Sequence, residues 1–373
     1  MSKIRFIGLD VHAETIAVAV ADSGGEVRSL GVIPNRAESI RKLVKHVGPA
    51  ESLRVCYEAG PTGYVIYWQL TGLGVRCEVV APTLIPTKAG DRVKTDRRDA
   101  EKLARSHRAG DLTAVWVPDA AHEALRDLVR AREAAKKDQL RARHRLGKFL
   151  LRHGRRPPMP MGAWTHRHLA WITQVQFAQP AQEATLLDYR HEVDHAADRL
   201  VRLERAIDDA VTTAPAQMRA VIDALQALRG IALVSAVTIV AEVGELSRFP
   251  RAPQLMGYGG LGAREDSSGA RTRRGGITKT GNAHLRRIAI EAAWNYRHRP
   301  FVGAGLRKRQ AHLSEEVKAI GWKAQHRLHA RYRKLIGRGK CQQQVVTAVG
   351  RELLGFIWAI GVLVETASRA AAA

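Results

Sequence analysis

Residues 4–10 read IRFIGLD, an apolar run that ends on the carboxylate of Asp10. A run of this length and composition is typical of a β-strand. Two more strand-like runs follow at residues 15–21 and 26–33, with a Ser-Gly-Gly turn at 23–25 between them. We therefore expect an antiparallel meander of three strands.

Helix and strand patterns alternate after this meander. The expected elements are a helix over residues 37–47, a strand over 53–58, a helix over about 63–71, a strand over 75–80, and helices after Pro82. The order βββαβαβα matches the ribonuclease-H-like architecture, an α/β fold in which the first and fourth strands lie side by side. We expect this domain to occupy residues 1–118.

Four carboxylates stand where these elements end or begin, in a chain that is otherwise basic. Asp10 ends the first strand and Glu58 ends the fourth, whereas Asp96 and Asp99 lie where a helix begins. Mg²⁺ prefers such oxygen ligands, and two ions that clamp the attacking and leaving oxygens of a phosphodiester commonly cut a nucleic-acid backbone. The pattern predicts a nuclease-like magnesium site. The alternative is that each residue merely caps a helix or closes a turn.

The charge balance indicates a polyanionic partner. The 373 residues include 60 Lys and Arg against 36 Asp and Glu, which gives a formal net charge of +24. Such a surface attracts nucleic acid. Because 45% of the residues are hydrophobic, the chain can bury more than one core, which argues for a multi-domain globular protein rather than a histone-like one.

We expect neither an export signal nor a membrane span. Residues 1–3 lead directly into the first strand without an apolar signal segment, and no stretch reaches about eighteen uncharged apolar residues. The three cysteines are too few and too scattered for a disulfide framework or a zinc module. These features predict a soluble protein of the reducing cytoplasm.

A long helical segment follows the α/β domain. We expect one helix from residue 120 to about 153, a break at the Pro-rich stretch 155–160, and an amphipathic helix over about 182–211. Two long helices around a break predict a coiled-coil arm over residues 119–213, which would pair with itself or with a second protomer. A helical bundle within one monomer is the alternative.

The third domain, residues 214–373, is expected to be mainly helical. Residues 225–243 read as a helix, a hinge at Gly230 and a second helix. This order is similar to the helix-hairpin-helix elements whose backbone amides meet DNA phosphates. The segment therefore predicts a helix-hairpin-helix-like element.

A Gly-rich loop over residues 257–281 contains Ser267 and Ser268. Five cations in the same loop are expected to bind nucleic acid: Arg264, Arg271, Arg273, Arg274 and Lys279. Cations can cradle phosphate oxygens and activate a hydroxyl group. The loop thus predicts either a phosphate-binding site or a serine nucleophile.

Several motifs, taken in order, resemble those of a known family. They are IGLDVH at 7–12, YEAGPTGY at 57–64, KTDRRDA at 94–100, and SSG at 267–269 followed by GITKTGN at 276–282 and LRR at 285–287. They are similar to the motifs of the DEDD transposases of the insertion-sequence family numbered 110, which also include the Piv-type DNA invertases. The likeness covers nearly the whole chain, and the ordered set is more specific than any one motif.

The resemblance implies a RuvC-like domain whose Asp10, Glu58, Asp96 and Asp99 bind Mg²⁺, joined by a coiled coil to a transposase domain with a catalytic serine. By position in the family's Ser-Gly motif that serine is Ser268, with Ser267 adjacent to it. Where the family has a proline before the arginine, residues 260–264 read GLGAR, and this loss would make the approach to the serine less rigid.

The resemblance also implies action on target and donor DNA, guided by a structured RNA that the element encodes. The basic surface is compatible with such an RNA. The four carboxylates and the serine lie on domains that a long arm joins, so the carboxylates of one protomer reach the serine of another more easily than their own. We therefore expect a homodimer that assembles into a tetramer on two DNA duplexes. The protein would work in the cytoplasm, on the nucleoid.

Three other functions compete with this interpretation. A metal-dependent RuvC-like nuclease or junction resolvase would need the four acids and no serine. An actin-like or sugar-kinase ATPase also begins with a strand that ends in Gly-x-Asp, but it needs further Gly-rich phosphate loops, and the expected α/β domain has no second one. A non-catalytic nucleic-acid-binding protein would explain the charge but not the placement of the acids.

Overall fold

The computed structural model describes residues 4–87, 90, 94–269 and 271–372. It divides into two compact units, residues 1–117 and 118–373. The helices of the expected arm and those of the expected third domain both belong to the second unit. The division of that unit at residue 213 stays a prediction.

Five strands form the mixed sheet of the first unit. They are β1 (Arg5–Val11), β2 (Thr15–Asp22), β3 (Val27–Pro34), β4 (Leu53–Glu58) and β5 (Arg76–Val80). The order across the sheet is β3-β2-β1-β4-β5, and β1 runs antiparallel to β2 and parallel to β4. The predicted meander and the predicted pairing of the first and fourth strands are confirmed.

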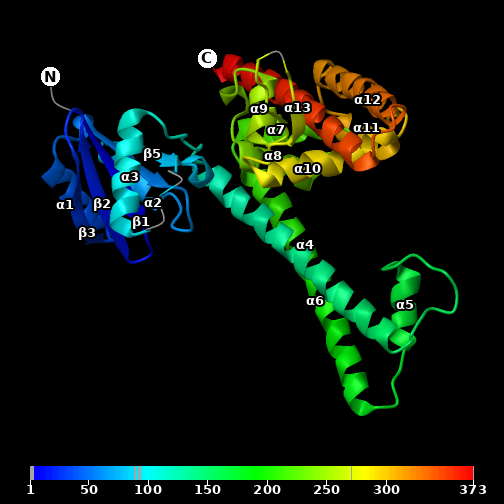
Figure 1. The fold of residues 1–373 in the computed structure, drawn as a ribbon. Coiled ribbons are helices and arrows are strands. Elements are labelled where there is room, and N and C mark those ends of the chain that lie inside the picture. The colour runs from blue at the N-terminus through cyan, green and yellow to red at the C-terminus, as the bar shows by residue number, and fades with distance from the viewer. Residues whose placement is uncertain (1–3, 88–89, 91–93, 270, 373) are drawn as a thin grey trace. The chain divides into compact units, whose positions relative to one another are not determined.

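Helices cover both faces of this sheet (Figure 1). They are α1 (Ala37–Val47), α2 (Val65–Gly72) and α3 (Asp96–Ala109), with 3₁₀ turns at Ala50–Ser52 and Pro82–Leu84. On one face, Leu9 of β1 shares an apolar core with Ile40 of α1 and Ile66 of α2. On the other face, alanines of β2 pack with Ala100 and Ala104 of α3.

Gly8 sets the distance between β1 and α3. A Cβ at this position would lie 2.3 Å from the carbonyl oxygen of Ala100 and 2.4 Å from the amide nitrogen of Ala104. The helix can approach this closely only because Gly8 has no side chain. Since side chains alternate along a strand, Asp10 is on the same face as Gly8. The close contact therefore brings the first turn of α3 toward the end of β1.

Two long helices form the arm in the second unit. They are α4 (Ala120–Arg152) and α6 (Pro180–Thr213), and α5 (His166–Gln174), which the sequence did not predict, lies in the connection between them. α4 and α6 lie along each other (Figure 1), and Leu146 and Phe149 of α4 share a core with Leu186 and Val193 of α6. Both long helices and the break are confirmed, whereas a coiled coil stays a prediction.

The rest of the second unit is mainly helical, as predicted. Its described helices are α7 (Ala216–Leu225), α8 (Leu233–Val243), α9 (Ala252–Tyr258), α10 (Ala283–Ala293), α11 (Ala304–Gln310), α12 (Glu315–Ile336) and α13 (Gln342–Ala372), with 3₁₀ turns at Leu246–Arg248 and Trp294–Arg297. α8 is buried throughout residues 236–243. Leu353, Ile357 and Ile360 of α13 pack into the same core.

α13 is, among the described helices, the one long and apolar enough to cross a membrane by length and composition. Half of the relevant stretch is nevertheless buried inside the protein. Glu365, which is 2% exposed, accepts hydrogen bonds from the amides of Leu246 and Ser247 at 2.7 Å each. This is the packing of a core helix.

The turn between α7 and α8 faces the inside of the second unit. Leu228 and Ile231 are fully buried there, and Gly230 has a φ of +83°. A Cβ on Gly230 would lie 2.6 Å from the carbonyl oxygen of Ala292, so the turn packs directly against α10. The predicted hinge at Gly230 and the helix after it are present, but the helix before the hinge, α7, already ends at Leu225. DNA binding by this turn stays a prediction.

Candidate active site

The end of β1 and the start of α3 bring three ionisable side chains together. The Nε2 atom of His12 lies 3.3 Å from Oδ2 of Asp10 and 3.5 Å from Oδ1 of Asp96. One potential ligand atom from each of these residues lies within 4.8 Å of the other two. Asp96 is held in place because Thr95 caps α3, its hydroxyl oxygen accepting from the amide of Arg98 at 3.4 Å.

Glu58 and Asp99 line an open groove of about 260 Å³ in the same region, together with Lys94 and Lys102. The Nζ atom of Lys94 lies 3.9 Å from Oδ2 of Asp99. Glu58 is the last residue of β4, the strand that pairs with β1. The four predicted carboxylates therefore lie at the ends of two neighbouring strands and on the first turn of one helix.

Burial and the neighbouring carboxylates raise the pKa of Asp10. Burial is the largest cause of the increase; His12 opposes it, and the charges of Asp99 and Asp96 add to it. Carboxylates that repel one another in this way are stabilised by a cation placed between them. Carboxylate oxygens suit a hard divalent ion such as Mg²⁺, so the residues present fit the predicted metal.

His12 is a member of this cluster that the sequence-based prediction omitted. It follows Asp10 by two positions, and residues two apart point to the same side of an extended chain. That spacing was the available signal. An imidazole nitrogen is more typical of transition-metal sites than of Mg²⁺ sites, so His12 broadens the range of divalent ions that the cluster suits.

The Gly-rich segment of the second unit folds as a small hairpin, which the sequence did not predict. Its strands are β6 (Ala263–Glu265) and β7 (Arg274–Ile277). The five predicted cations lie on or beside this hairpin and are all exposed: Arg264, Arg271, Arg273, Arg274 and Lys279. Arg274 pairs with Glu265 across the two strands at 3.4 Å. The hairpin thus presents several cations to solvent.

The two serines lie at the tip of the hairpin and differ in their contacts. The amide of Ser268 donates to the carbonyl of Arg271 at 3.2 Å, and the amide of Arg271 donates back at 3.1 Å. The hydroxyl of Ser267 donates to Oε1 of Glu265 at 3.0 Å. The exposed hydroxyl of Ser268 has no hydrogen-bond partner within the described parts of the chain.

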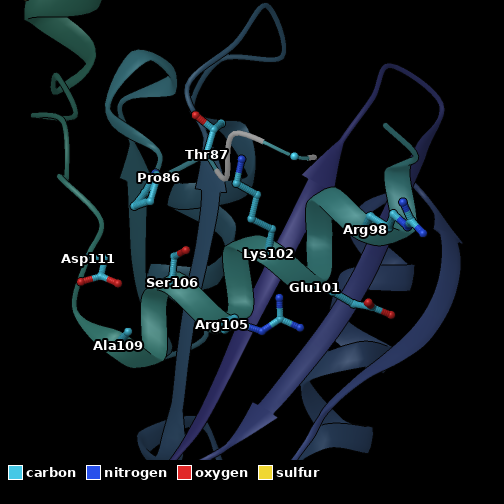
Figure 2. A pocket seen from close by; sticks show the side chains of 10 residues that line it. Pro86, Thr87, Arg98, Glu101, Lys102, Arg105, Ser106, Ala109 and Asp111 are labelled. Carbon is cyan, nitrogen blue, oxygen red and sulfur yellow. The ribbon is translucent and has the colours of Figure 1, made fainter. Parts of the chain in front are cut away.

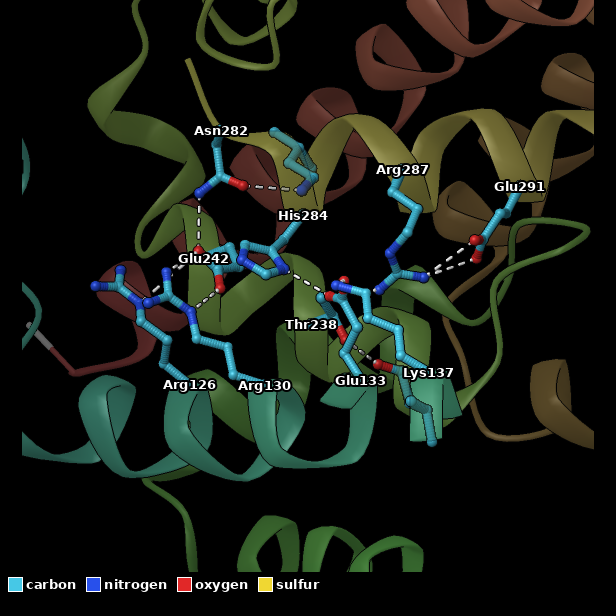
Figure 3. A network of polar contacts seen from close by, with 12 residues as sticks. Arg126, Arg130, Glu133, Lys137, Thr238, Glu242, Asn282, His284, Arg287 and Glu291 are labelled. Carbon is cyan, nitrogen blue, oxygen red and sulfur yellow. Dashed lines mark hydrogen bonds and ion pairs between the residues drawn. The ribbon is translucent and has the colours of Figure 1, made fainter. Parts of the chain in front are cut away.

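A buried carboxylate holds the base of the hairpin (Figure 3). The side chain of Glu242 in α8 is 1% exposed and accepts hydrogen bonds from Arg130 of α4 at 2.8 and 3.0 Å. It also accepts one from the side-chain amide of Asn282 at 2.8 Å. The side-chain oxygen of Asn282 caps α10 by accepting a hydrogen bond from the backbone amide of Leu285, and the backbone amide of Asn282 donates to the carbonyl of Tyr258. Glu242 therefore links α4 and α8 to the point where the hairpin returns to α10.

Burial alone would raise the pKa of Glu242, but the hydrogen bonds from Arg130 and Asn282 lower it below its usual range. The sequence-based prediction did not identify this network. The available signal was a single carboxylate within the apolar run 233–243, because a charge in such a run needs a partner when the helix is buried. Its partners lie far away along the chain.

Another carboxylate, that of Glu133 in α4, contacts two side chains of α10. Oε2 of Glu133 lies 2.6 Å from Nδ1 of His284 and 3.0 Å from a guanidinium nitrogen of Arg287 (Figure 3). Burial opposes ionisation of Glu133, but hydrogen bonds from Lys137 and His284 and the charge of Arg287 lower its pKa to about 2. Ionised contacts therefore fix α10 on α4.

Known families match the segment with the four carboxylates and the segment with the hairpin. Residues 7–154 match the DEDD family of IS110, described as "Transposase", and residues 222–302 match the "Transposase IS116/IS110/IS902 family". The "Transposase for insertion sequence element IS1533" of Leptospira borgpetersenii is 31% identical over 342 residues, which cover 90% of this chain and 97% of that protein. The chain belongs to the IS110 family of transposases. The "Putative transposase y4qE" of Sinorhizobium fredii is 47% identical to this transposase over 358 residues, 95% of this chain and 88% of that protein.

The two family matches fall on different parts of the transposase. The first runs from β1 to the end of α4 and contains the four carboxylates. The second runs from α7 to the segment after α10 and contains the hairpin with Ser268. Membership of the family confirms the predicted activity in DNA transposition.

Proposed function

We propose that the transposase cuts and rejoins DNA with two sets of groups: the carboxylates at β1, β4 and α3, and the hydroxyl of Ser268. The observation that carries this proposal is the convergence of Asp10 and Asp96 on His12, at 3.3 and 3.5 Å, in a chain with a net charge of +24. Carboxylates that repel one another are suited to divalent cations, and the basic surface is suited to DNA.

Asp10, Glu58, Asp96 and Asp99 would hold Mg²⁺, with His12 beside them. When bound, the ions polarise the phosphodiester and stabilise negative charge on its oxygens. Lys94, which lines the groove of Glu58 and Asp99, would orient a neighbouring phosphate.

Ser268 would act as the nucleophile. Its oxygen forms a bond to phosphorus, the bond from phosphorus to a deoxyribose oxygen breaks, and that oxygen gains a proton in place of the one that the serine hydroxyl loses. One ester bond is made for each one broken, so a deoxyribose hydroxyl can later attack the phosphoserine and rejoin a strand. Ser268 is favoured over Ser267 because the hydroxyl of Ser267 already donates to Glu265. Arg271 and Arg273 would neutralise the phosphate oxygens.

The proposed assembly is a homodimer that forms a tetramer on two DNA duplexes, guided by a structured RNA of the element, on the nucleoid in the cytoplasm. The carboxylates and Ser268 belong to different compact units, which allows different protomers to supply them. Leu140 and Leu151 of α4 are 54% and 57% exposed and lie about three helical turns apart on one side of the helix. This exposed apolar side supports contact with a second protomer.

A covalent adduct tests the proposal. The purified transposase, RNA from the flanking element, labelled DNA and Mg²⁺ should give a protein–DNA adduct that protease destroys. Ser268→Ala and Asp10→Ala should each abolish the adduct, whereas the matched control Ser267→Ala should retain it. Full strand exchange by Ser268→Ala would favour a metal-dependent RuvC-like nuclease or junction resolvase instead.

A further inference from the structure

α3 borders a second, larger groove next to the carboxylates. The groove encloses about 830 Å³, and its lining includes Thr87 from the segment before α3 and Asp111 just after the helix (Figure 2). From α3 itself the lining includes Arg98, Lys102, Arg105 and Ser106. We call this surface the α3 groove.

The cations of the α3 groove form a stripe. Residues 98, 102 and 105 are four and three positions apart, a spacing that places side chains on one face of a helix. With a rise of about 1.5 Å per residue, the stripe is about 10 Å long. It therefore offers positive charge along a line rather than at one point.

The acidic residues of the groove do not neutralise Lys102 and Arg105. Glu101 is already bound by Arg97, whose Nε donates to it at 2.9 Å. Asp111 lies beyond the C-terminal end of α3. Within the parts of the chain that the structure describes, neither Lys102 nor Arg105 forms an ion pair with a carboxylate. Both cations are thus available to a bound anion.

The α3 groove continues into the groove of the carboxylates. Lys102 and Thr87 line both of them, and the smaller groove also contains Glu58 and Asp99. A ligand that extends along the stripe from Arg105 to Lys102 therefore reaches the proposed metal-binding residues.

The lining decides the chemical class of this ligand. Sites for small organic molecules enclose the ligand, whereas this groove is open and carries cations and hydroxyl groups beside Pro86 and Ala109. A single free phosphate needs one anchoring point, but a row of cations suits regularly spaced phosphates. Cations that contact phosphates fix the register of a nucleic-acid strand without reading its sequence.

We propose that the α3 groove binds the phosphate backbone of the DNA strand that the transposase cuts. Lys102 and Arg105 hold successive phosphates to one side of the scissile phosphate, and the hydroxyls of Thr87 and Ser106 donate hydrogen bonds to phosphate oxygens. The proposal rests on the proposed function and extends it, because it assigns the surface that positions the strand.

The salt dependence of DNA binding tests this assignment. The full-length transposase is titrated, without divalent ions so that no strand is cut, with a fluorescent DNA duplex and with an RNA duplex of the same sequence. Each phosphate contact contributes about 0.9 to the slope of log affinity against log salt. The double variant Lys102→Gln/Arg105→Gln should therefore lower the slope for DNA by about 1.8. The ratio of the parent's affinity for DNA to that of the variant should therefore fall about twelvefold when the salt rises from about 50 to 200 mM.

A charge-matched variant controls for the net charge of the protein. Arg41→Gln/Lys42→Gln removes two exposed cations of α1 that line neither groove, and it should leave the slope unchanged. Equal slopes for the two double variants would overturn the proposal, and so would a reduced slope for RNA alone. Failure of the proposed function can be distinguished from failure of this proposal. The former would appear as adduct formation by Asp10→Ala, whereas the latter would appear in the binding slopes.

Discussion

Replacement of Glu242 by leucine removes a buried carboxylate and leaves the cations around it. Arg126, which is 7% exposed, lies 3.9 Å from this carboxylate, and Arg130 donates two hydrogen bonds to it. Breaking a buried ion pair from one side costs about 3–5 kcal/mol because the remaining charge stays buried. The side chain of Arg130 is 48% exposed, so water moderates its loss. We therefore expect the free energy of unfolding to fall by about 3 kcal/mol, the lower end of that range.

Urea unfolding followed by far-ultraviolet circular dichroism measures this change, because the long helices belong to the second unit. Glu242→Gln should lie between the parent and Glu242→Leu, since it keeps hydrogen-bonding capacity without the charge. Glu291→Leu is the matched control: its side chain is 59% exposed and pairs with Arg287 at 2.9 Å, so its loss should cost only about 0.3–0.5 kcal/mol. A Glu242→Leu protein within about 0.5 kcal/mol of the parent would refute the role of this network.

Three further changes test other parts of the molecule. Gly8→Ala places a Cβ 2.3 Å from the carbonyl oxygen of Ala100, so urea unfolding should show a loss of about 1–3 kcal/mol; unchanged stability would mean that α3 adapts freely. Asp10→Asn should remove the stabilisation of thermal unfolding by Mg²⁺, about 2.7 kcal/mol for the parent at a hundredfold excess over Kd, and equal stabilisation of both proteins would remove Asp10 from the site. The pKa of Glu133 is lowered from 4.5 to about 2, so its stabilising effect is complete above about pH 4.5 and is lost as the pH falls toward 2; Glu133→Gln should weaken this acid dependence of the urea midpoint, and an unaltered profile would contradict the assignment.

The α/β unit could be predicted because its signals are local. The apolar runs that end on Asp10 and Glu58 are β1 and β4, and α3 begins at Asp96. Because β1 and β4 are neighbours, carboxylates at their ends had to be close to one another. The resemblance of ordered motifs then gave the family, which the comparisons confirm.

The hairpin and the buried network could not be predicted because their causes are not local. β6 and β7 consist almost entirely of exposed residues, including two glycines in β7, so they lack the alternation that indicates a strand. Glu242 depends on Arg130, more than a hundred residues away along the chain. His12 was accessible to sequence reasoning, since its spacing from Asp10 places both on one side of an extended chain.

Mass spectrometry of the protein–DNA adduct is the measurement that tests the central claim most directly. Trypsin cleaves after Arg264 and Arg271, which leaves both serines in one short peptide over residues 265–271, and fragmentation of that peptide locates the attached nucleotide. The proposed mechanism predicts a nucleotide on Ser268 that forms only with a divalent ion and is absent from Asp10→Ala. DNA cut to free ends, with no nucleotide on this peptide, would contradict it.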